Sequence, residues 1–412
     1  MHLYLVLIMP WFRWALALLI LVYGLLTYDR ESISWGVAGL LLYVVPLALQ
    51  ATRRVLARTY ALWLGIFLMV QSLLSFYFID NFVSLSPHLR LTVKISATDI
   101  PGILPGTRYI STDALGFRAT PAVDYLHKRG YRIFAIGGST TEEIMLDDHS
   151  TWPYLLQQRL QQPGQPVEVI NTGVSGLRAS NHLATLRDIL PYQPDLVIFL
   201  MGANDWNQQI KNHFEWRNHL PPVLRYTLVG KAVQQLVIFP LKSLWMKDRP
   251  QQKTMHILSM ADYSNPRKSL FKAIQHRYHP SDVAMNYAET LGKISRICHE
   301  NKVPCLFMTQ PSGYHPAASP AFQESFWMTP PYASYTLDIE SMAHIAALYN
   351  RHMLDFARQA GHPSCDIAPG VAASYAHFFD DMHYNETGAQ RVAELVAPCV
   401  QTIMAKQYGT SK

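Results

Sequence analysis

Short apolar runs alternate with helical stretches from about residue 130 onward, and this alternation restricts the fold more than any other feature of the sequence. The runs are nearly uninterrupted, as in strands that are covered on both faces. The expected strands are residues 132–137, 167–171, 195–201, 303–309 and 363–367. The expected helices are residues 151–160, 179–190, 283–300, 335–359 and 385–408. Strands separated by helices predict a three-layer α/β/α domain with a parallel sheet, over residues 131–408.

Polar residues gather directly after three of these strands and before the last helix. The groups are residues 137–141 (GGSTT), 171–176 (NTGVSG), 202–205 (GAND) and 380–383 (DDMH). Ligands of open α/β sheets bind outside the carboxyl ends of the strands. We therefore expect all four groups to meet at one edge of the sheet.

Ser139 stands at a strand-to-helix turn, behind two glycines. A hydroxyl there would be exposed, and the N-terminus of the following helix would favour a developing anion. Ser139 with Glu142 also matches a capping box, so a helix cap is the alternative interpretation. The turn lacks the GxxxxGK[ST] pattern of a phosphate-binding loop.

Asp380 precedes His383 by three residues, and such a carboxylate can fix the tautomer of an imidazole and stabilise the imidazolium. Asn204 can direct a side-chain N–H at an oxyanion, with the backbone N–H groups of Gly176 and Ser139 as further donors. Alone, Asp-x-x-His occurs at many helix starts and Gly-x-Asn-Asp is an ordinary turn. Only the occurrence of these residues together, each after a strand or before the last helix, indicates a catalytic site.

Serine, glycine, asparagine and histidine in this order and context resemble the SGNH hydrolases, the GDSL-like esterases. The resemblance covers residues 131–406, and its most specific parts are residues 194–205 and 380–388. Residues 111–118 (STDALGFR) are similar to a lead-in segment of many bacterial members.

The resemblance implies a flavodoxin-like sheet and a serine hydrolase without cofactor or metal. It implies that Ser139 is the nucleophile, His383 the base and Asp380 the acid that orients it. It implies that the oxyanion donors are Ser139, Gly176 and Asn204.

The sequence departs from the family pattern in two places. The name-giving Gly-Asp-Ser is Gly-Gly-Ser at residues 137–139, as in some bacterial members with polysaccharide-related roles. Residues 206–282 form a long insertion with 12 Lys or Arg against 4 Asp or Glu. The insertion is either a solvated lid or a basic, aromatic surface for anionic lipid or an acidic polymer. His276 and His279 within it are not convincing metal ligands.

Three uncharged segments precede the domain. Residues 32–52 and 59–79 each reach the roughly 20 residues that a membrane-crossing helix needs, and residues 14–28 do so if Arg13 extends to the interface. A cleavable signal peptide explains only the first segment. We therefore expect a membrane anchor of three transmembrane helices in residues 1–80, followed by a linker and lead-in at 81–130.

The loops between these segments predict their orientation. Residues 53–58 contain three arginines and no acid, whereas residues 29–31 contain two acids and one arginine. Arginine-rich short loops remain in the cytoplasm. The N-terminus is then cytoplasmic, and the catalytic domain is extracytoplasmic, which means periplasmic for a protein of the bacterial inner membrane.

An oxidising compartment would allow the four cysteines to form two disulfides. The pairing that we expect first is Cys298 with Cys305 and Cys365 with Cys399, with buried free thiols as the alternative. Their spacing fits no zinc site. The net charge of +6 is too small for this length to argue for nucleic acid as a partner.

These features together predict a membrane-anchored extracytoplasmic serine esterase or acyltransferase. The expected substrate is an O-acyl group, most of all O-acetyl, of a cell-surface or exported polysaccharide, transferred through an acyl-enzyme on Ser139. The expected partners are this acylated glycan or an acyl acceptor, the lipid bilayer, and a membrane partner in a polysaccharide biosynthesis complex. The alternatives are a lysophospholipase-like lipid esterase and a non-catalytic scaffold subunit of such a complex.

Overall fold

The computed structural model describes residues 88–96, 102–118, 123–214, 251–257, 274–279, 285, 287–326, 330 and 335–409. All of them belong to one of the two compact units of the chain. The segments expected to cross the membrane, at 14–28, 32–52 and 59–79, lie outside these residues. Within the described ranges, no helix is both long and apolar enough to span a bilayer.

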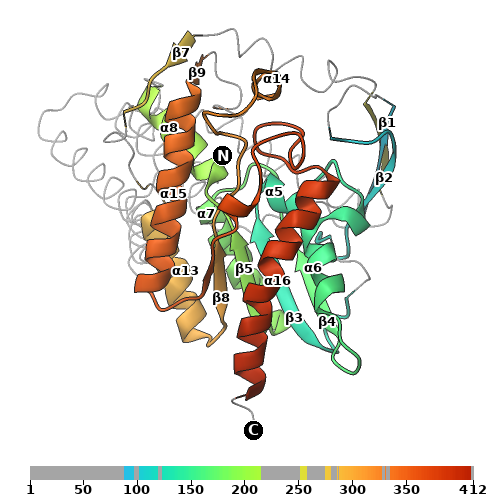
Figure 1. The fold of residues 1–412 in the computed structure, drawn as a ribbon. Coiled ribbons are helices and arrows are strands. Elements are labelled where there is room, and N and C mark those ends of the chain that lie inside the picture. Colours follow the sequence, from blue (N-terminus) through green and yellow to red (C-terminus); the bar gives the residue numbers. More distant parts are fainter. Residues whose placement is uncertain are drawn as a thin grey trace, which may run out of the picture. The chain divides into compact units, whose positions relative to one another are not determined.

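Five parallel strands form the central sheet (Figure 1). Their order is β10 (Ser364–Cys365), β8 (Cys305–Met308), β5 (Leu196–Leu200), β3 (Tyr131–Gly137) and β4 (Val167–Asn171). Counted along the chain this is the order 2-1-3-4-5 of flavodoxin-like sheets. The expected parallel sheet is therefore confirmed, and each strand lies within the range predicted for it or begins one residue earlier.

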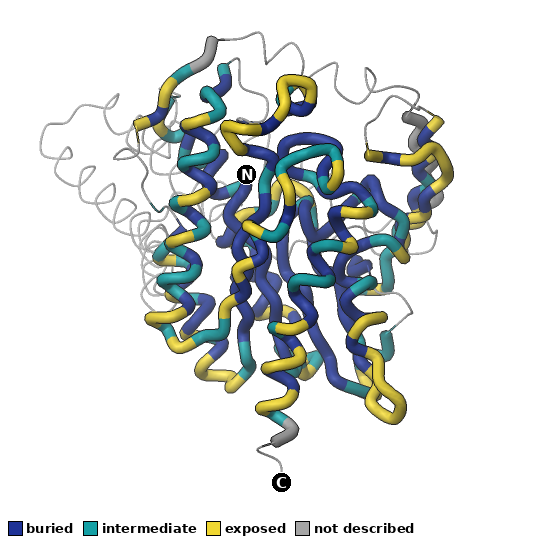
Figure 2. Tube along the Cα trace, viewed as in Figure 1, coloured by how far each residue is buried: buried dark blue, intermediate teal, exposed yellow. Residues whose placement is uncertain are grey.

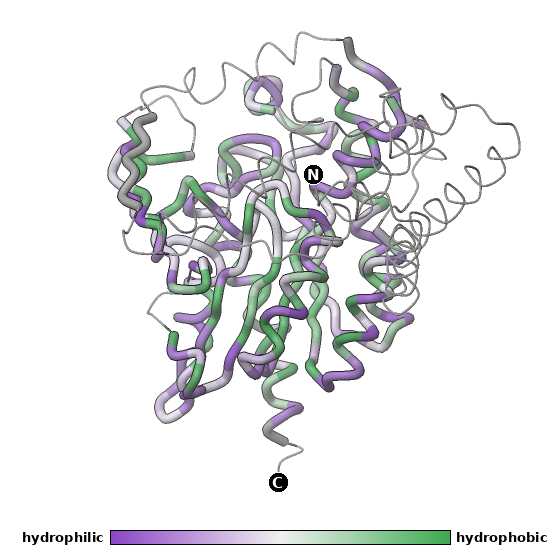
Figure 3. Tube along the Cα trace, turned by 180° about the vertical axis from the view of Figure 1, so that it is seen from behind, coloured by the Kyte–Doolittle hydropathy of each residue, from purple (hydrophilic) through white to green (hydrophobic). Residues whose placement is uncertain are grey.

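The strands form where the sequence is continuously apolar. Every residue of β3 and β5 is buried, and Phe199 of β5 stacks on Phe307 of β8 with ring centroids 5.2 Å apart. The central strands are correspondingly dark in Figure 2 and hydrophobic in the reverse view of Figure 3. A sheet that is apolar on both faces requires a helical layer on each.

Helices supply both layers. They are α6 (Trp152–Leu160), α7 (Ala179–Ile189), α13 (Ala288–Glu300), α15 (Ile339–Gln359) and α16 (Glu386–Gly409). α6 packs against α16 and β4, whereas α7 packs against α13 and β3 (Figure 1). Right-handed crossovers place α6 and α7 on opposite faces of the sheet.

Two of the expected helices begin later than predicted. α13 starts at Ala288 rather than at 283, and α15 starts at Ile339 rather than at 335. Residues Tyr335–Leu337 instead form the strand β9, which pairs with β7 (Ile274–His276). Asp338 then caps α15 by accepting a hydrogen bond from the Ser341 N–H at 2.8 Å, which fixes the start of that helix.

The expected linker contains strands that the sequence analysis did not predict. β1 (Leu89–Ile95) pairs antiparallel with β2 (Gly106–Ser111) and parallel with β6 (Gln251–Ile257). β6 and β7 both come from the basic insertion, so this segment adds strands to two small sheets. The first part of the insertion continues the helix α8 (Ala203–Phe214).

Two disulfides close the domain with the expected pairing. Cys298 is bonded to Cys305, between α13 and β8, and Cys365 is bonded to Cys399, between β10 and α16. The alternative of buried free thiols is therefore wrong. The second bridge fixes the short edge strand β10 to the last helix, which begins three residues after the predicted base His383.

Candidate active site

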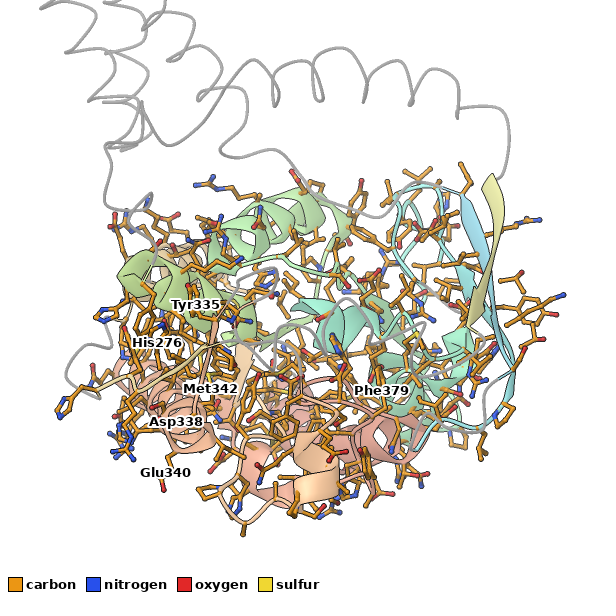
Figure 4. All side chains as sticks on the ribbon, turned by 90° about the horizontal axis from the view of Figure 1, so that it is seen from above. His276, Tyr335, Asp338, Glu340, Met342 and Phe379 are labelled. Carbon is orange, nitrogen blue, oxygen red and sulfur yellow. A yellow bond between two sulfur atoms is a disulfide. The ribbon has the colours of Figure 1, made fainter. Side chains whose placement is uncertain are left out.

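The four polar groups meet where the strand order reverses. The chain leaves β3 to form β4 on one side, and returns as β5 on the other side of β3. The short helix α5 (Ser139–Glu142) follows β3, and α8 follows β5. Ligands of doubly wound sheets bind at such a switch point, and Figure 4 looks onto this edge from above.

Ser139 is the first residue of α5, and Gly138 is its N-cap. A Cβ added to Gly137 would lie 2.1 Å from Thr141 Oγ1 and 2.7 Å from the Leu200 carbonyl oxygen. The glycine thus allows the turn to fold tightly against β5. This turn places the half-exposed Ser139 at the positive end of a helix.

Asn204 lies beside the same turn. A Cβ on Gly138 would be 2.8 Å from Asn204 Nδ2, so the second glycine allows the amide to approach the residue before Ser139. Asn204 Nδ2 also donates a hydrogen bond to the Leu177 carbonyl at 2.8 Å. An amide nitrogen carries two hydrogens, so one remains for a ligand. The sequence analysis noted that Gly-x-Asn-Asp alone is an ordinary turn, whereas Asn204 lies in the first turn of α8.

Gly176 lies in the loop between β4 and α7, one residue before Leu177. Its φ of +81° is in the left-handed region, which glycine adopts at no steric cost. A Cβ there would meet open space, and the Gly176 N–H has no acceptor among the described residues. Asn204 and Gly176 are therefore brought together through Leu177, at the edge where Ser139 stands.

Asp380 and His383 form a hydrogen-bonded pair. His383 Nδ1 lies 2.7 Å from Asp380 Oδ2. Asp380 Oδ1 accepts the N–H groups of Met382 at 2.8 Å and His383 at 2.7 Å, which explains the spacing of three residues. Phe379 stacks on the imidazole with centroids 5.7 Å apart, and Figure 4 labels it.

Asp380 is fully buried, and the His383 side chain is 15% exposed. Burial acts to raise the pKa of Asp380, but the charge of His383 and the hydrogen bonds from His383 and Met382 lower that pKa below its usual value. An ionised carboxylate at this position favours the imidazolium form of His383. The pair is thus arranged to accept a proton on the second ring nitrogen.

A buried polar chain joins the neighbours of Ser139 and His383. Thr140 Oγ1 donates to Gln310 Oε1 at 3.2 Å, and Gln310 Nε2 donates to the Tyr384 hydroxyl at 3.3 Å. Hydrogen bonds of catalytic groups are often loose in unliganded sites and tighten with substrate.

The capping-box interpretation of Ser139 is wrong. The N-cap of α5 is Gly138, and no side chain caps the helix. Glu142 does not reach back to the start of the helix. Its carboxylate accepts hydrogen bonds from the backbone N–H and the hydroxyl of Ser175 in the β4–α7 loop.

Glu142, Ser175 and Arg118 lie beside the site. The sequence analysis considered Glu142 only as part of a capping box, and it assigned no role to Ser175 or to the side chain of Arg118. The signal for Glu142 was its position three residues after Ser139. The signal for Arg118 was its position at the end of the lead-in segment.

The His276 and Tyr335 rings lie close together at the β7–β9 pair, apart from Phe379 (Figure 4). Their ring centroids are 5.7 Å apart, and His276 also stacks on Phe214. The described residues include no cluster of three or more His, Cys, Asp or Glu that could hold a metal ion. This histidine is part of an aromatic cluster.

A model of the GDSL-like lipase/acylhydrolase family matches residues 135–391. An arylesterase of Vibrio mimicus is 37% identical over 75 residues, which are 18% of this chain and 38% of that protein. Esterase TesA of Pseudomonas aeruginosa is 34% identical over 74 residues, 18% of this chain and 37% of the relative. The chain thus spans less than two fifths of the length of these relatives.

Among solved structures, the acetylxylan esterase Axe2 of Geobacillus stearothermophilus is 14% identical to this chain, with a TM-score of 0.36. The match covers 66% of this chain and 94% of that chain.

Proposed function

Because the chain belongs to the GDSL-like lipase/acylhydrolase family, we propose that it is a serine esterase or acyltransferase acting on O-acyl groups, chiefly O-acetyl, of a cell-surface or exported polysaccharide. The observation that carries this proposal is the hydrogen-bonded Asp380–His383 pair at the sheet edge that also holds Ser139 and Asn204. Nucleophile, base, orienting acid and oxyanion donor are then all present.

The reaction proceeds through an acyl-enzyme. Ser139 Oγ attacks the ester carbonyl carbon and passes its proton to His383 Nε2, while Asp380 holds Nδ1. The oxyanion accepts hydrogen bonds from Asn204 Nδ2 and from the backbone N–H groups of Gly176 and Ser139. The tetrahedral intermediate breaks its bond to the sugar oxygen, which takes the proton from His383.

The acyl group then leaves Ser139 by the reverse chemistry. Water, or a hydroxyl of a second sugar, gives its proton to His383 and attacks the acyl carbon. The bond from that carbon to Ser139 Oγ then breaks, and Ser139 Oγ takes the proton back from His383. Hydrolysis and transfer share every residue of the site and differ only in this acceptor.

Two features support an extracytoplasmic site for this reaction. The two disulfides fit an oxidising compartment. The arginine-rich loop at 53–58 fits a cytoplasmic N-terminus, with the domain on the other side of the inner membrane. An extracytoplasmic esterase would meet exported glycans directly, and its anchor would bring it close to a membrane partner that assembles them.

Active-site labelling tests the proposal. A fluorophosphonate probe should label the purified full chain, and Ser139→Ala should abolish labelling. His383→Ala should slow it by about 10³-fold or more, because the serine then lacks its base. Folded wild-type protein that does not react with the probe would contradict the enzyme proposal and favour a scaffold subunit.

A lipid ester is the second candidate substrate, because the insertion at 206–282 has 12 basic against 4 acidic residues. Chain length separates the two classes. For p-nitrophenyl esters, kcat/KM should be highest for acetate and fall by about tenfold or more by laurate, because an acetyl site has no room for a long chain. A preference for laurate would contradict the glycan proposal and favour the lipid esterase.

A further inference from the structure

Glu142 is a buried acid beside the candidate site, three residues after Ser139. Its side chain is on α5, and the residue is only 1% exposed. Oε2 accepts the Ser175 N–H at 2.6 Å and also accepts the Ser175 hydroxyl. One oxygen atom therefore joins the helix that begins at Ser139 to the β4–α7 loop.

Burial of this carboxylate opposes its ionisation. Burial raises the pKa of Glu142, and the hydrogen bonds from Ser175 act in the opposite direction. A buried ionisable group is expensive unless it is well paired, and an apolar residue of similar size is often at least as stable in its place. Packing alone therefore does not account for an acid at position 142.

The loop that Glu142 holds contains Gly176. Gly173 packs against the backbone of α5, since a Cβ there would lie 2.3 Å from the Glu142 nitrogen. Glu142 then binds Ser175, directly before Gly176, and Asn204 binds the carbonyl of Leu177, directly after it. The peptide of Gly176 is thus held from both sides, and its N–H has no acceptor in the described chain.

We propose that Glu142 is a positioning residue, which fixes the Gly176 N–H relative to Ser139 by binding Ser175. The inference rests on the proposed function, since it treats the Gly176 N–H as an oxyanion donor. A donor must lie within about 3 Å of the oxyanion to stabilise it, so a loop that is free to shift loses the effect. Glu142 itself does not touch the substrate.

The test compares stability with catalysis in the full chain. Glu142→Leu removes the charge and the acceptor but keeps the volume. We expect its thermal midpoint to equal or exceed that of the wild type, because Ser175 is exposed and water can satisfy its donors. We expect kcat for p-nitrophenyl acetate to fall by about 100-fold, with KM within about twofold, as for loss of one oxyanion donor.

Three further variants complete the design. Glu142→Gln should recover most of the lost kcat, because its amide oxygen can accept both bonds from Ser175. Ser175→Ala keeps the backbone bond and loses the hydroxyl bond, so kcat should fall only about threefold to tenfold. Glu143→Gln is the matched control, because its carboxylate binds the Trp152 N–H at 2.7 Å, away from the loop. It should keep the kcat of the wild type.

The outcomes separate this inference from the proposed function. Wild-type kcat in both Glu142→Leu and Ser175→Ala, with Ser139 still labelled in the wild type, would overturn the positioning role alone. A fall in kcat accompanied by a lower midpoint and no recovery in Glu142→Gln would indicate a structural role and also overturn it. If wild-type Ser139 is not labelled at all, the proposed function fails instead. If Glu142→Leu does not fold, the test uses the other two variants. A threefold to tenfold fall in kcat for Ser175→Ala, with most of the wild-type kcat kept in Glu142→Gln, supports the positioning role. Wild-type kcat in Ser175→Ala overturns it.

Discussion

At the scale of single residues, Asp205 is the buried acid whose ionisation bears on stability. It lies next to Asn204, and both of its carboxylate oxygens are 3.2 Å from the Ala179 N–H at the start of α7. Burial raises the pKa of Asp205 to about 7, and the hydrogen bond from Ala179 opposes this rise. The first turn of α8 therefore carries an acid whose pKa is close to neutral pH.

The raised pKa predicts how the stability of the domain depends on pH. Between about pH 4 and 7 the folded state keeps a proton on Asp205 that the unfolded state releases. The stabilising contribution of Asp205 to the free energy of unfolding is thus complete below about pH 4, and it is lost as the pH rises through 7. The loss is at most about 1.4 kcal/mol per pH unit.

Asp205→Asn should remove this dependence, because an amide does not titrate. We expect its thermal midpoint to fall less between pH 5 and pH 8 than that of the wild type, measured by circular dichroism. Asp355→Asn, a change at a half-exposed position on α15, serves as the control and should follow the wild type. If the thermal midpoints of Asp205→Asn and of the wild type change with pH in parallel, Asp205 does not titrate between pH 5 and pH 8.

At the scale of elements, Arg118 connects the lead-in segment to the end of α5. Its guanidinium is buried and donates to the carbonyl groups of Glu142, of Glu143 at 3.1 Å and of Leu146 at 3.0 Å. It also pairs with Asp148 at 2.9 Å. A cation at the carboxyl end of a helix satisfies carbonyl groups that have no partner within the helix. The resemblance of residues 111–118 to a family lead-in thus corresponds to a contact that holds the turn of Ser139.

The sheet was predictable because its signal is local. β3 and β5 are continuous apolar runs, and their ends lie within one residue of those expected. β1 also had a local signal, since Leu89, Leu91, Val93 and Ile95 alternate with polar residues. Its parallel partner was not predictable, because Leu89 pairs with Gln251, 162 positions later and within the insertion.

The residues of the site could be predicted from the sequence, whereas some of the contacts that they make could not. The Asp380–His383 pair follows from their spacing, because a turn of three residues brings carboxylate and imidazole together. The role of Glu142 did not follow, since a capping box and a bond to a distant loop both place an acid three residues after the serine. Which of these two bonds Glu142 makes depends on the position of Ser175. That position is set by β4, which precedes the loop, and by the hydrogen bond from Asn204 to the Leu177 carbonyl.

At the scale of the whole molecule, the two disulfides and the apolar segments of the first 80 residues both fit the proposed extracytoplasmic position of the domain. Cys365–Cys399 closes a loop of 34 residues around His383, so an oxidising compartment would stabilise the element that holds the base. Three crossings from a cytoplasmic N-terminus would place this domain in that compartment. An even number of crossings would place it in the reducing cytoplasm.

Reporter fusions test this arrangement. Alkaline phosphatase fused after Lys412 should be active, because it folds only where its disulfides form, and green fluorescent protein at the same site should not fluoresce. Truncation at Ala57, within the arginine-rich loop, should reverse both results, because it removes the third segment (59–79) and leaves two crossings, which return the fusion point to the cytoplasm. A fluorescent fusion after Lys412 would contradict the orientation and the periplasmic glycan substrate together. Inactive phosphatase at both sites would instead count against the segment assignments, since one of the two positions must be extracytoplasmic when three helices cross the membrane.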